Sequence, residues 1–180
     1  MNLNTGGVHN HGLGLSTPVP GPFKDDAALE ALYVAVRDQD FPAAEWSHEV
    51  RLMLAVYLLC RAPLEPAEAL LSTLIQDYEA SAGIARSDAI GTHATITIAS
   101  LAAIRAFLGG APIGWGLHQF ANSICHSRLA APGWLERFWS LDRLYSRAAR
   151  AHWIDPDLRA FPFPRSQPLW GLRGPERSAE

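Results

Sequence analysis

The sequence of 180 residues has only two cysteines, Cys60 and Cys125, and they stand far apart without a Cys-x-x-Cys pair. This excludes a disulfide framework and a cysteine-based zinc knuckle, so we expect two reduced, packed thiols. Lysine is almost missing, since Lys24 is the only one, and the formal net charge is -3. A protein that neutralises nucleic-acid phosphates needs a basic surface, so no nucleic-acid partner is expected.

Long apolar runs are missing as well. The longest one, Leu52 to Cys60, is about half of the roughly 18 to 20 residues that a membrane span needs. The N-terminal residues lack the basic and apolar regions of a secretory signal, so we expect a cytoplasmic protein with no membrane partner. The chain also lacks the glycine-rich phosphate loops, the His-Glu-x-x-His and Gly-x-Ser-x-Gly motifs and the calcium loop. Nucleotide, zinc-protease and hydrolase chemistry therefore have no support.

The composition predicts one domain with flexible ends. With 48% hydrophobic and 18% charged residues, the chain has enough apolar surface to close one core. Residues 1–23 are rich in Gly, Asn and Pro, which predicts a flexible tail. We expect the helical bundle in residues 24–160. An extended, proline-rich segment over 161–180 should lie on the body, because it carries aromatic residues.

Apolar residues recur at helical spacing through most of the chain, between loops rich in Gly and Pro. The pattern predicts an all-α, single-domain bundle of about five main helices plus short ones. Pro42 suits the first turn of the second helix, and Gly83 suits the end of the third. The β-branched run Thr95–Ile98 also fits a strand, but the alanine-rich continuation favours helix. The main helices are expected over residues 25–39, 41–62, 64–83, 87–110 and 117–130, and the short ones over 133–140 and 141–153.

Three polar side chains stand at the head of the second helix, just before its apolar run. His48 and Arg51 are three positions apart and share a face, and Glu45 lies one turn earlier on the same side. One interpretation is a helix end at the surface, where acids favour the first turn and His48 and Arg51 reach water. The other is a polar pocket at the rim of the core, because the run that follows is apolar on every side.

The fourth helix carries a similar change from polar to apolar residues. His93 lies near its start and Thr97 one turn later, and the same face continues to Ile104. If the second and fourth helices enter the core side by side, His48, Arg51, His93 and Thr97 converge on one cavity. Buried polar groups without partners are costly, so such a set must be satisfied by one another, by water or by a ligand. Core histidines that are satisfied by their neighbours are the alternative.

The segments EWSHEVRL, IQDYEASAG, GTHATITIAS and FWSLDRLYSRAARAHWIDPDL resemble a group of small, uncharacterised bacterial helical proteins over about residues 40 to 160. That group has Trp-x-His-x-x-His-Leu on one helix, Tyr-Asn-x-x-x-Gly after the next and Tyr-His-Glu-Thr on a third. The resemblance implies a metal or acid/base site in the bundle core. Trp46, His48, Tyr78 and His93 match the group's pattern, and Tyr78 is a candidate to add its phenol to the cavity.

Two positions depart from that pattern. Arg51 stands where the group has its second histidine, and Ala94 stands where it has glutamate. These changes remove two of four ligands, which disfavours a transition metal. An arginine at this place favours an anion such as a carboxylate or a phosphate, through its planar fork.

Three functions fit these patterns. The first is a cofactor-independent enzyme of isomerase, lyase, cyclase or dehydratase type, in which His48 or His93 serves as general acid/base and Arg51 binds an anionic small molecule. Glu45, Trp46, Tyr78 and Thr97 would complete its binding site. The second is a non-catalytic helical module that binds a ligand or a partner protein, and the third is a metal site of His48 and His93 with Glu45 or Glu79. A homodimer is left open.

The last helical segment alternates arginine and aspartate. Arg143, Arg147 and Arg150 fall on nearby faces there, which predicts ion pairs on the surface. His118, Asn122 and His126 follow one another at four-residue steps on the fifth helix. We expect them at the surface or partly packed, with no functional role.

Overall fold

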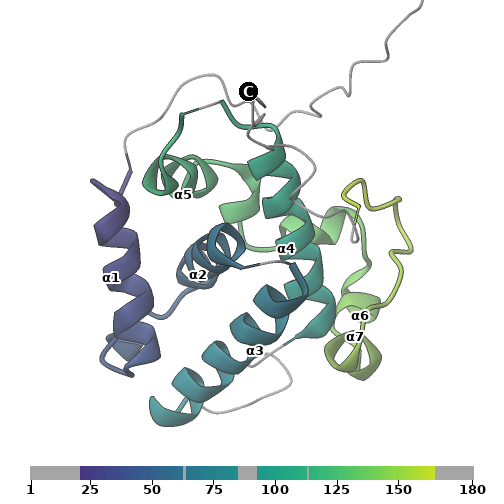
Figure 1. Ribbon diagram of the computed structural model, residues 1–180. Helices are drawn as coiled ribbons and strands as arrows, with labels where there is room; N and C mark the ends of the chain where they lie inside the picture. The colour runs from purple at the N-terminus through teal and green to yellow at the C-terminus, as the bar shows by residue number, and fades with distance from the viewer. Residues whose placement is uncertain (1–20, 63, 85–92, 113, 165–180) are drawn as a thin grey trace, which may run out of the picture.

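The computed structural model describes residues 21–62, 64–84, 93–112 and 114–164, and over these ranges it is helical without a strand (Figure 1). The all-α prediction is therefore confirmed, with five long helices and several short ones. No described helix is long and apolar enough to cross a membrane. The elements in chain order are α1 (Asp26–Arg37), η1 (Ala43–Glu45), α2 (His48–Arg61), α3 (Leu64–Ser81), α4 (Ala94–Gly109), α5 (Leu117–Cys125), η2 (Arg128–Ala130), η3 (Trp134–Arg137), α6 (Leu141–Leu144) and α7 (Arg147–Ala151).

Helix α2 is the central element of the bundle. In Figure 1 it lies between α1, α3, α4 and α5, and each of these four helices contacts it. Its residues 52–59 are all buried, so no face of this stretch reaches water. A helix that is apolar on all sides gains most when other helices cover it completely. The prediction that this helix forms the core of the bundle is confirmed.

The start of α2 differs from the prediction. Pro42 and Glu45 do not belong to it, because a separate 3₁₀ turn, η1, ends at Glu45 and the chain is extended at Trp46 and Ser47. The Ser47 hydroxyl caps α2 by accepting a hydrogen bond from the N–H of Val50 at 3.3 Å. A serine cap stabilises a helix start at the next residue, so α2 begins at His48. Glu45 is therefore not one turn behind His48 on a shared face, and that prediction is wrong.

The third and fourth helices follow the predicted pattern. Helix α3 ends at Ser81, and Gly83 adopts a positive φ of 67°, while the N–H of Ile84 donates to the carbonyl of Glu79. This is the glycine-assisted helix end that the sequence predicts. The Thr95–Ile98 run is helical, as predicted. The helix starts at Ala94 with His93 as its N-cap, and residues 87–92 lie outside the described part of the chain.

The residues after α5 fold back onto α4 and form a second, smaller core. The expected fifth helix over 117–130 divides into α5 and η2, because Ser127 is extended and caps η2 with its hydroxyl. Trp139 lies fully buried at the centre of the second core, and its indole N–H donates to the carbonyl of Ile154 at 3.1 Å. Phe161 packs against Trp139, with ring centroids 5.3 Å apart.

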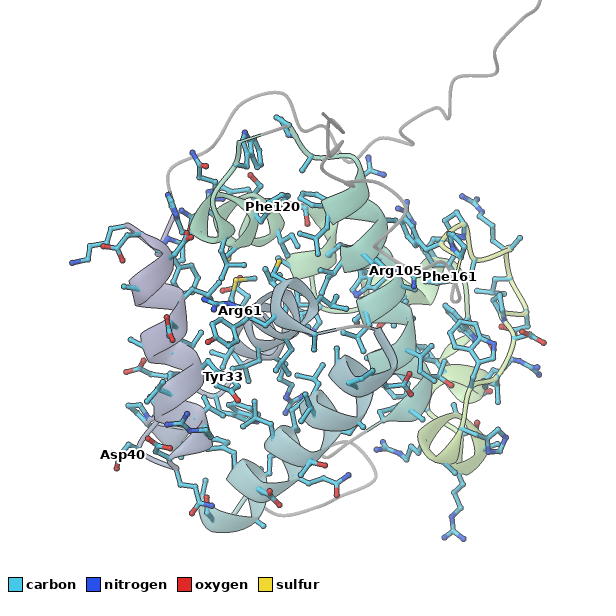
Figure 2. The ribbon with its side chains drawn as sticks, in the orientation of Figure 1. Tyr33, Asp40, Arg61, Arg105, Phe120 and Phe161 are labelled. Atoms are coloured by element: carbon cyan, nitrogen blue, oxygen red, sulfur yellow. The ribbon has the colours of Figure 1, made fainter. Side chains whose placement is uncertain are left out.

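The start of the C-terminal segment lies on the body, as the sequence predicts. Figure 2 shows Phe161 beside α4, close to Arg105. Arg105 is buried on α4 and donates through a guanidinium nitrogen to the carbonyl of Pro164. Residues 165–180, including Trp170, lie outside the described residues.

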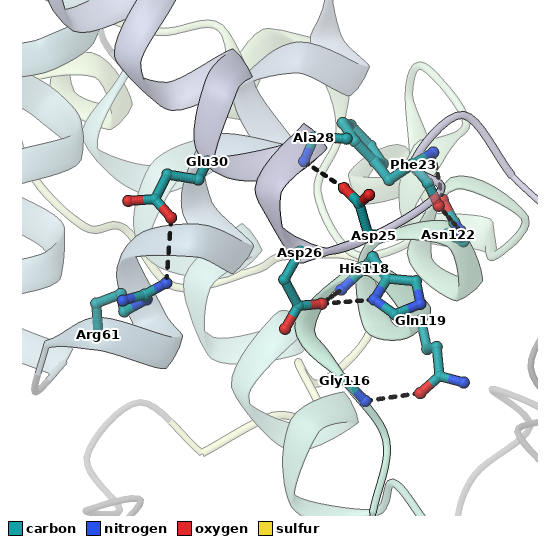
Figure 3. Close-up of polar contacts among 10 residues, drawn as sticks. All are labelled: Phe23, Asp25, Asp26, Ala28, Glu30, Arg61, Gly116, His118, Gln119 and Asn122. Carbon is teal, nitrogen blue, oxygen red and sulfur yellow. Dashed lines mark hydrogen bonds and ion pairs between the residues drawn. The ribbon is translucent and has the colours of Figure 1, made fainter.

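The other end of the chain is attached to α5. The side chain of Asn122 forms two hydrogen bonds with the backbone of Phe23, accepting from its N–H at 3.1 Å and donating to its carbonyl at 2.8 Å (Figure 3). Figure 3 also shows Asp26 with His118, which joins α1 to α5. The predicted flexible tail reached residue 23, whereas Phe23 is held against the core; residues 1–20 lie outside the described residues.

Candidate functional site

A cavity of about 100 Å³ lies between α2, α3, α4 and the α6–α7 segment. It includes four of the seven residues that the sequence predicts for a site: His48, Arg51, His93 and Thr97. The proposed convergence of α2 and α4 on one hollow is therefore observed. The full lining is His48, Arg51, Leu52, Leu71, Ile75, His93, Ile96, Thr97, Ser100, Tyr145 and Arg150.

His48 is the first residue of α2 and has one ring nitrogen fixed by the backbone. Its Nε2 lies 2.9 Å from the carbonyl oxygen of Leu129 in η2. A carbonyl oxygen only accepts hydrogen bonds, so Nε2 carries the proton and donates it. In the neutral ring Nδ1 then has the free lone pair, and the described residues offer it no hydrogen-bond donor. This is the arrangement in which a second group fixes the tautomer of a histidine base.

His93 differs from His48 because both of its ring nitrogens bind the backbone. Nδ1 accepts from the N–H of Ile96 at 3.3 Å, which caps α4, and Nε2 donates to the carbonyl of Leu144 at 2.8 Å. Burial lowers the pKa of His93, and nearby Arg150 lowers it further, against the opposite effect of the Leu144 hydrogen bond. The ring is thus a neutral helix cap and a wall of the cavity. The predicted acid/base role of His93 does not fit this geometry, since neither nitrogen is free to exchange a proton.

Arg51 reaches the cavity but already has a counter-ion. Its Nη2 donates to Oε1 of Glu79 at 2.9 Å, and Glu79, on α3, is only 1% exposed. The same Oε1 accepts from the indole N–H of Trp46 at 3.1 Å, and the Arg51 guanidinium lies 5.3 Å from the Trp46 ring. Any anion that Arg51 binds therefore lies near a buried carboxylate that offsets the guanidinium charge.

Arg150, for which the Arg/Asp alternation predicts ion pairing, lines the cavity. No described acidic side chain forms an ion pair with it, and Arg143 donates to the backbone carbonyl of Asp155 rather than to a carboxylate. Tyr145 stands beside it at the rim, with 45% of its surface exposed.

Long-range contacts hold the segment that contains α6 and α7 against α4. Besides the bond between His93 and Leu144, the Thr95 hydroxyl donates to the carbonyl of His152 at 2.9 Å and accepts from the N–H of Ile154 at 3.2 Å. These contacts join residues more than fifty positions apart, so helical periodicity gives no sign of them. The polar Thr95 inside an apolar helix was the one available signal, since a buried hydroxyl needs a partner.

Three predicted site residues do not line the cavity. Tyr78 is buried and donates through its hydroxyl to the carbonyl of Phe41 at 2.8 Å, and burial raises its pKa. Trp46 packs on Tyr78, with ring centroids 4.4 Å apart, and its ring contacts the Arg51 guanidinium. Glu45 is exposed in η1. The interpretation of Tyr78 as an aromatic that closes the bundle end fits these contacts best.

Among the described residues, no group of three or more His, Cys, Asp or Glu side chains is placed to hold a metal ion. The set predicted from the sequence, His48 and His93 with Glu45 or Glu79, does not come together, because Glu79 binds Arg51 and both nitrogens of His93 bind the backbone.

The cavity lining contains both polar and aliphatic residues. Arginine, histidine, serine, threonine and tyrosine occur together with four aliphatic residues, and no carboxylate is among the described lining residues. Comparison of the chain with protein-family models, with curated proteins and with solved structures finds no match. The geometry of the cavity therefore carries the functional argument.

Proposed function

We propose that the protein is a cofactor-independent enzyme that binds a small organic anion in this cavity and exchanges a proton with it through His48. The observation that carries the proposal is the lining itself: two arginine residues, four aliphatic residues and no carboxylate among the described lining residues. Guanidinium groups bind carboxylates well, and aliphatic side chains favour a hydrocarbon body.

The size of the cavity limits the ligand. A dry cavity of about 150 Å³ accepts benzene, so a cavity of about 100 Å³ suits a ligand with no more non-hydrogen atoms than benzene, such as a short-chain acid. A ligand of about six non-hydrogen atoms gains little contact, and we expect a Kd on the order of 1 mM, or roughly 4 kcal/mol. A Kd in this range is suited to a small metabolite. We propose that such an acid is the natural ligand, in a cytoplasmic protein.

His48 is the best candidate for proton transfer because its tautomer is fixed. The Leu129 carbonyl holds Nε2–H, so Nδ1 is available as a base, and a histidine base works well near neutral pH. For a keto acid, Nδ1 would take the proton from the carbon next to the carbonyl. This leaves an enolate that the arginine side chains stabilise, and the proton returns to carbon or to a neighbouring atom. Isomerase, lyase and dehydratase reactions on keto acids can begin with this step.

The test uses pyruvate in heavy water, with methyl proton exchange followed by proton NMR. The key variant is His48→Gln, because the glutamine amide keeps a donor for the Leu129 carbonyl and removes the base. The matched control is His93→Asn, which retains an acceptor for capping α4. We expect exchange in the wild type and in His93→Asn, and none above the buffer rate in His48→Gln. Equal exchange in all three proteins would refute the role of His48.

The second candidate is a non-catalytic module that binds the same kind of anion. The contacts of His93 favour this non-catalytic function, because both ring nitrogens of one of the two cavity histidines are hydrogen-bonded to the backbone. Binding of isobutyrate by calorimetry, together with no exchange of pyruvate protons in the wild type, would support this function over catalysis. Membership in the bacterial helical family stays a prediction from the sequence.

A further inference from the structure

The buried carboxylate of Glu79 bears on which anion the cavity accepts. A count of the lining alone gives two positive charges, from Arg51 and Arg150, and predicts a dianion such as a dicarboxylate or phosphate. Glu79 lies outside the lining but binds Arg51 directly, so the count of the lining omits a negative charge that acts on the cavity.

Arg51 and Glu79 form a pair that is neutral as a unit. The Arg51 Nη2 to Glu79 Oε1 distance is 2.9 Å, and only 1% of the Glu79 side chain is exposed. Glu79 Oε2 is buried without a hydrogen-bond donor among the described residues, so Arg51 is the main counter-ion of this carboxylate. The Glu79 carboxylate is shielded from water, whereas 33% of the Arg51 side chain is exposed. The charge of Glu79 is therefore screened weakly over the short distance to the cavity.

The remaining charge in the cavity belongs to Arg150. His93 adds none, because its Nδ1 accepts from the N–H of Ile96 and the ring is neutral. No described carboxylate pairs with Arg150. With His93 neutral and His48 acting as the neutral base of the proposed reaction, the Arg51–Glu79 pair and Arg150 leave a net charge of one, and this charge lies on the α7 side of the cavity.

We propose that Glu79 sets the charge selectivity of the cavity, so that it binds small monocarboxylates in preference to dianions. The inference rests on the proposed anion site and adds its substrate class: one carboxylate toward Arg150 and a short aliphatic body against Ile96, Leu71 and Ile75. Glu79 touches no ligand. It acts through Arg51, and it is a specificity-determining residue.

The experiment compares the binding of four probes by calorimetry: isobutyrate, malonate, inorganic phosphate and neutral isobutyramide. Wild-type protein should bind isobutyrate at least about tenfold more tightly than malonate or phosphate, because a dianion brings a second charge into the cavity with no counter-charge to offset its lost hydration. Isobutyramide should bind more weakly than isobutyrate.

The decisive variant is Glu79→Gln. Its amide oxygen still accepts from Arg51 and Trp46, so the shape is kept while one negative charge is removed. We expect the ratio of malonate to isobutyrate affinity to rise by about tenfold. Glu45→Gln is the matched control, because it makes the same charge change at an exposed residue of η1 and should leave the ratio within about twofold, as expected for a solvent-screened charge.

The two proposals fail in different ways. If neither isobutyrate nor any other probe binds wild-type protein, the anion site itself is wrong. If isobutyrate binds but malonate or phosphate binds as well or better, the anion site stands and the role of Glu79 is refuted. An unchanged ratio in Glu79→Gln refutes it too.

A further variant covers the case in which Glu79→Gln does not fold. The double variant Arg51→Gln with Glu79→Gln removes the pair as a unit and leaves the net charge as in the wild type, and buried ion pairs are often replaceable by neutral groups. Its malonate to isobutyrate ratio should stay near the wild-type value. A rise of about tenfold in the double variant would contradict the charge argument.

Discussion

Replacing His93 tests its assignment as a structural cap, and the cost can be worked from its contacts. His93→Ala removes the cap on α4, a contact typically worth about 1 kcal/mol and less here because the Nδ1 to Ile96 distance is long, at 3.3 Å. It also leaves the buried Leu144 carbonyl without its donor, which costs roughly 1 to 3 kcal/mol. We expect a total loss of about 1 to 4 kcal/mol in the free energy of unfolding. His93→Asn restores the cap only, and should recover less than about 1 kcal/mol.

The assay is urea unfolding followed by circular dichroism, with the free energy taken from linear extrapolation. A cost below about 0.5 kcal/mol for His93→Ala would refute the structural role, because that is the range of an unimportant surface change. If His93→Asn is no more stable than His93→Ala, the capping contact between His93 and the N–H of Ile96 does not stabilise α4.

His93 should also make the free energy of unfolding depend on pH. The pKa of His93 is lower in the folded protein than its ordinary value of 6.5, mainly because of burial. The unfolded chain therefore binds more protons below this pH, so the stabilising effect is complete above about pH 6.5 and is lost as the pH falls toward the folded pKa. His93→Asn should show a flatter decline between about pH 7 and pH 5, where side-chain carboxylates are still ionised. An identical slope in both proteins would show that other groups cause the decline.

Three further predictions concern other parts of the molecule. Cys125, whose pKa burial raises to about 11, should react with iodoacetamide at pH 8 far more slowly than exposed Cys60, as read by peptide mass spectrometry; equal rates would contradict its packing. Trp139→Phe should cost about 1 to 3 kcal/mol, since the Ile154 carbonyl loses its donor and a small void forms; urea unfolding with no change would mean that the second core does not depend on it. Asn122→Ala should speed amide hydrogen exchange at Phe23, which loses its side-chain partner, while amides in α4 keep their rates as the control; unchanged exchange at Phe23 would contradict the attachment.

The sequence predicts the bundle well because the main signals are local. The apolar run of α2 specifies a central helix, and Gly83 and the alanine-rich part of α4 mark helix ends and type correctly. The start of α2 was misplaced because Ser47 competes with Pro42 as a helix start, and the sequence alone does not rank a serine cap above a proline in the first turn. Helix boundaries are decided by one or two hydrogen bonds of this kind.

The site was predicted in part. His48, Arg51, His93 and Thr97 share a cavity because helical spacing fixes the face of each residue, and packing of α2 on α4 supplies the rest. What each side chain does there was not predictable, since it depends on distant partners. Leu129 fixes the tautomer of His48, Leu144 engages His93, and Glu79 neutralises Arg51.

Arg150 is the clearest example of a cavity residue that the sequence pattern does not predict. Its alternation with aspartates is typical of a solvated helix face, yet the fold turns α7 toward α4 and places the residue on the cavity. The contacts that cause this, through Thr95 and the second core around Trp139, join distant segments and leave no periodic pattern.

A crystal structure of the protein with saturating isobutyrate would show whether the cavity is an anion site. We predict that the acid lies inside the cavity, with its carboxylate about 3 Å from the Arg150 guanidinium and its methyl groups against the aliphatic lining residues. The Arg51 to Glu79 ion pair should remain intact beside it. A cavity that holds only water at saturating isobutyrate, or acid bound elsewhere on the surface, would contradict the account.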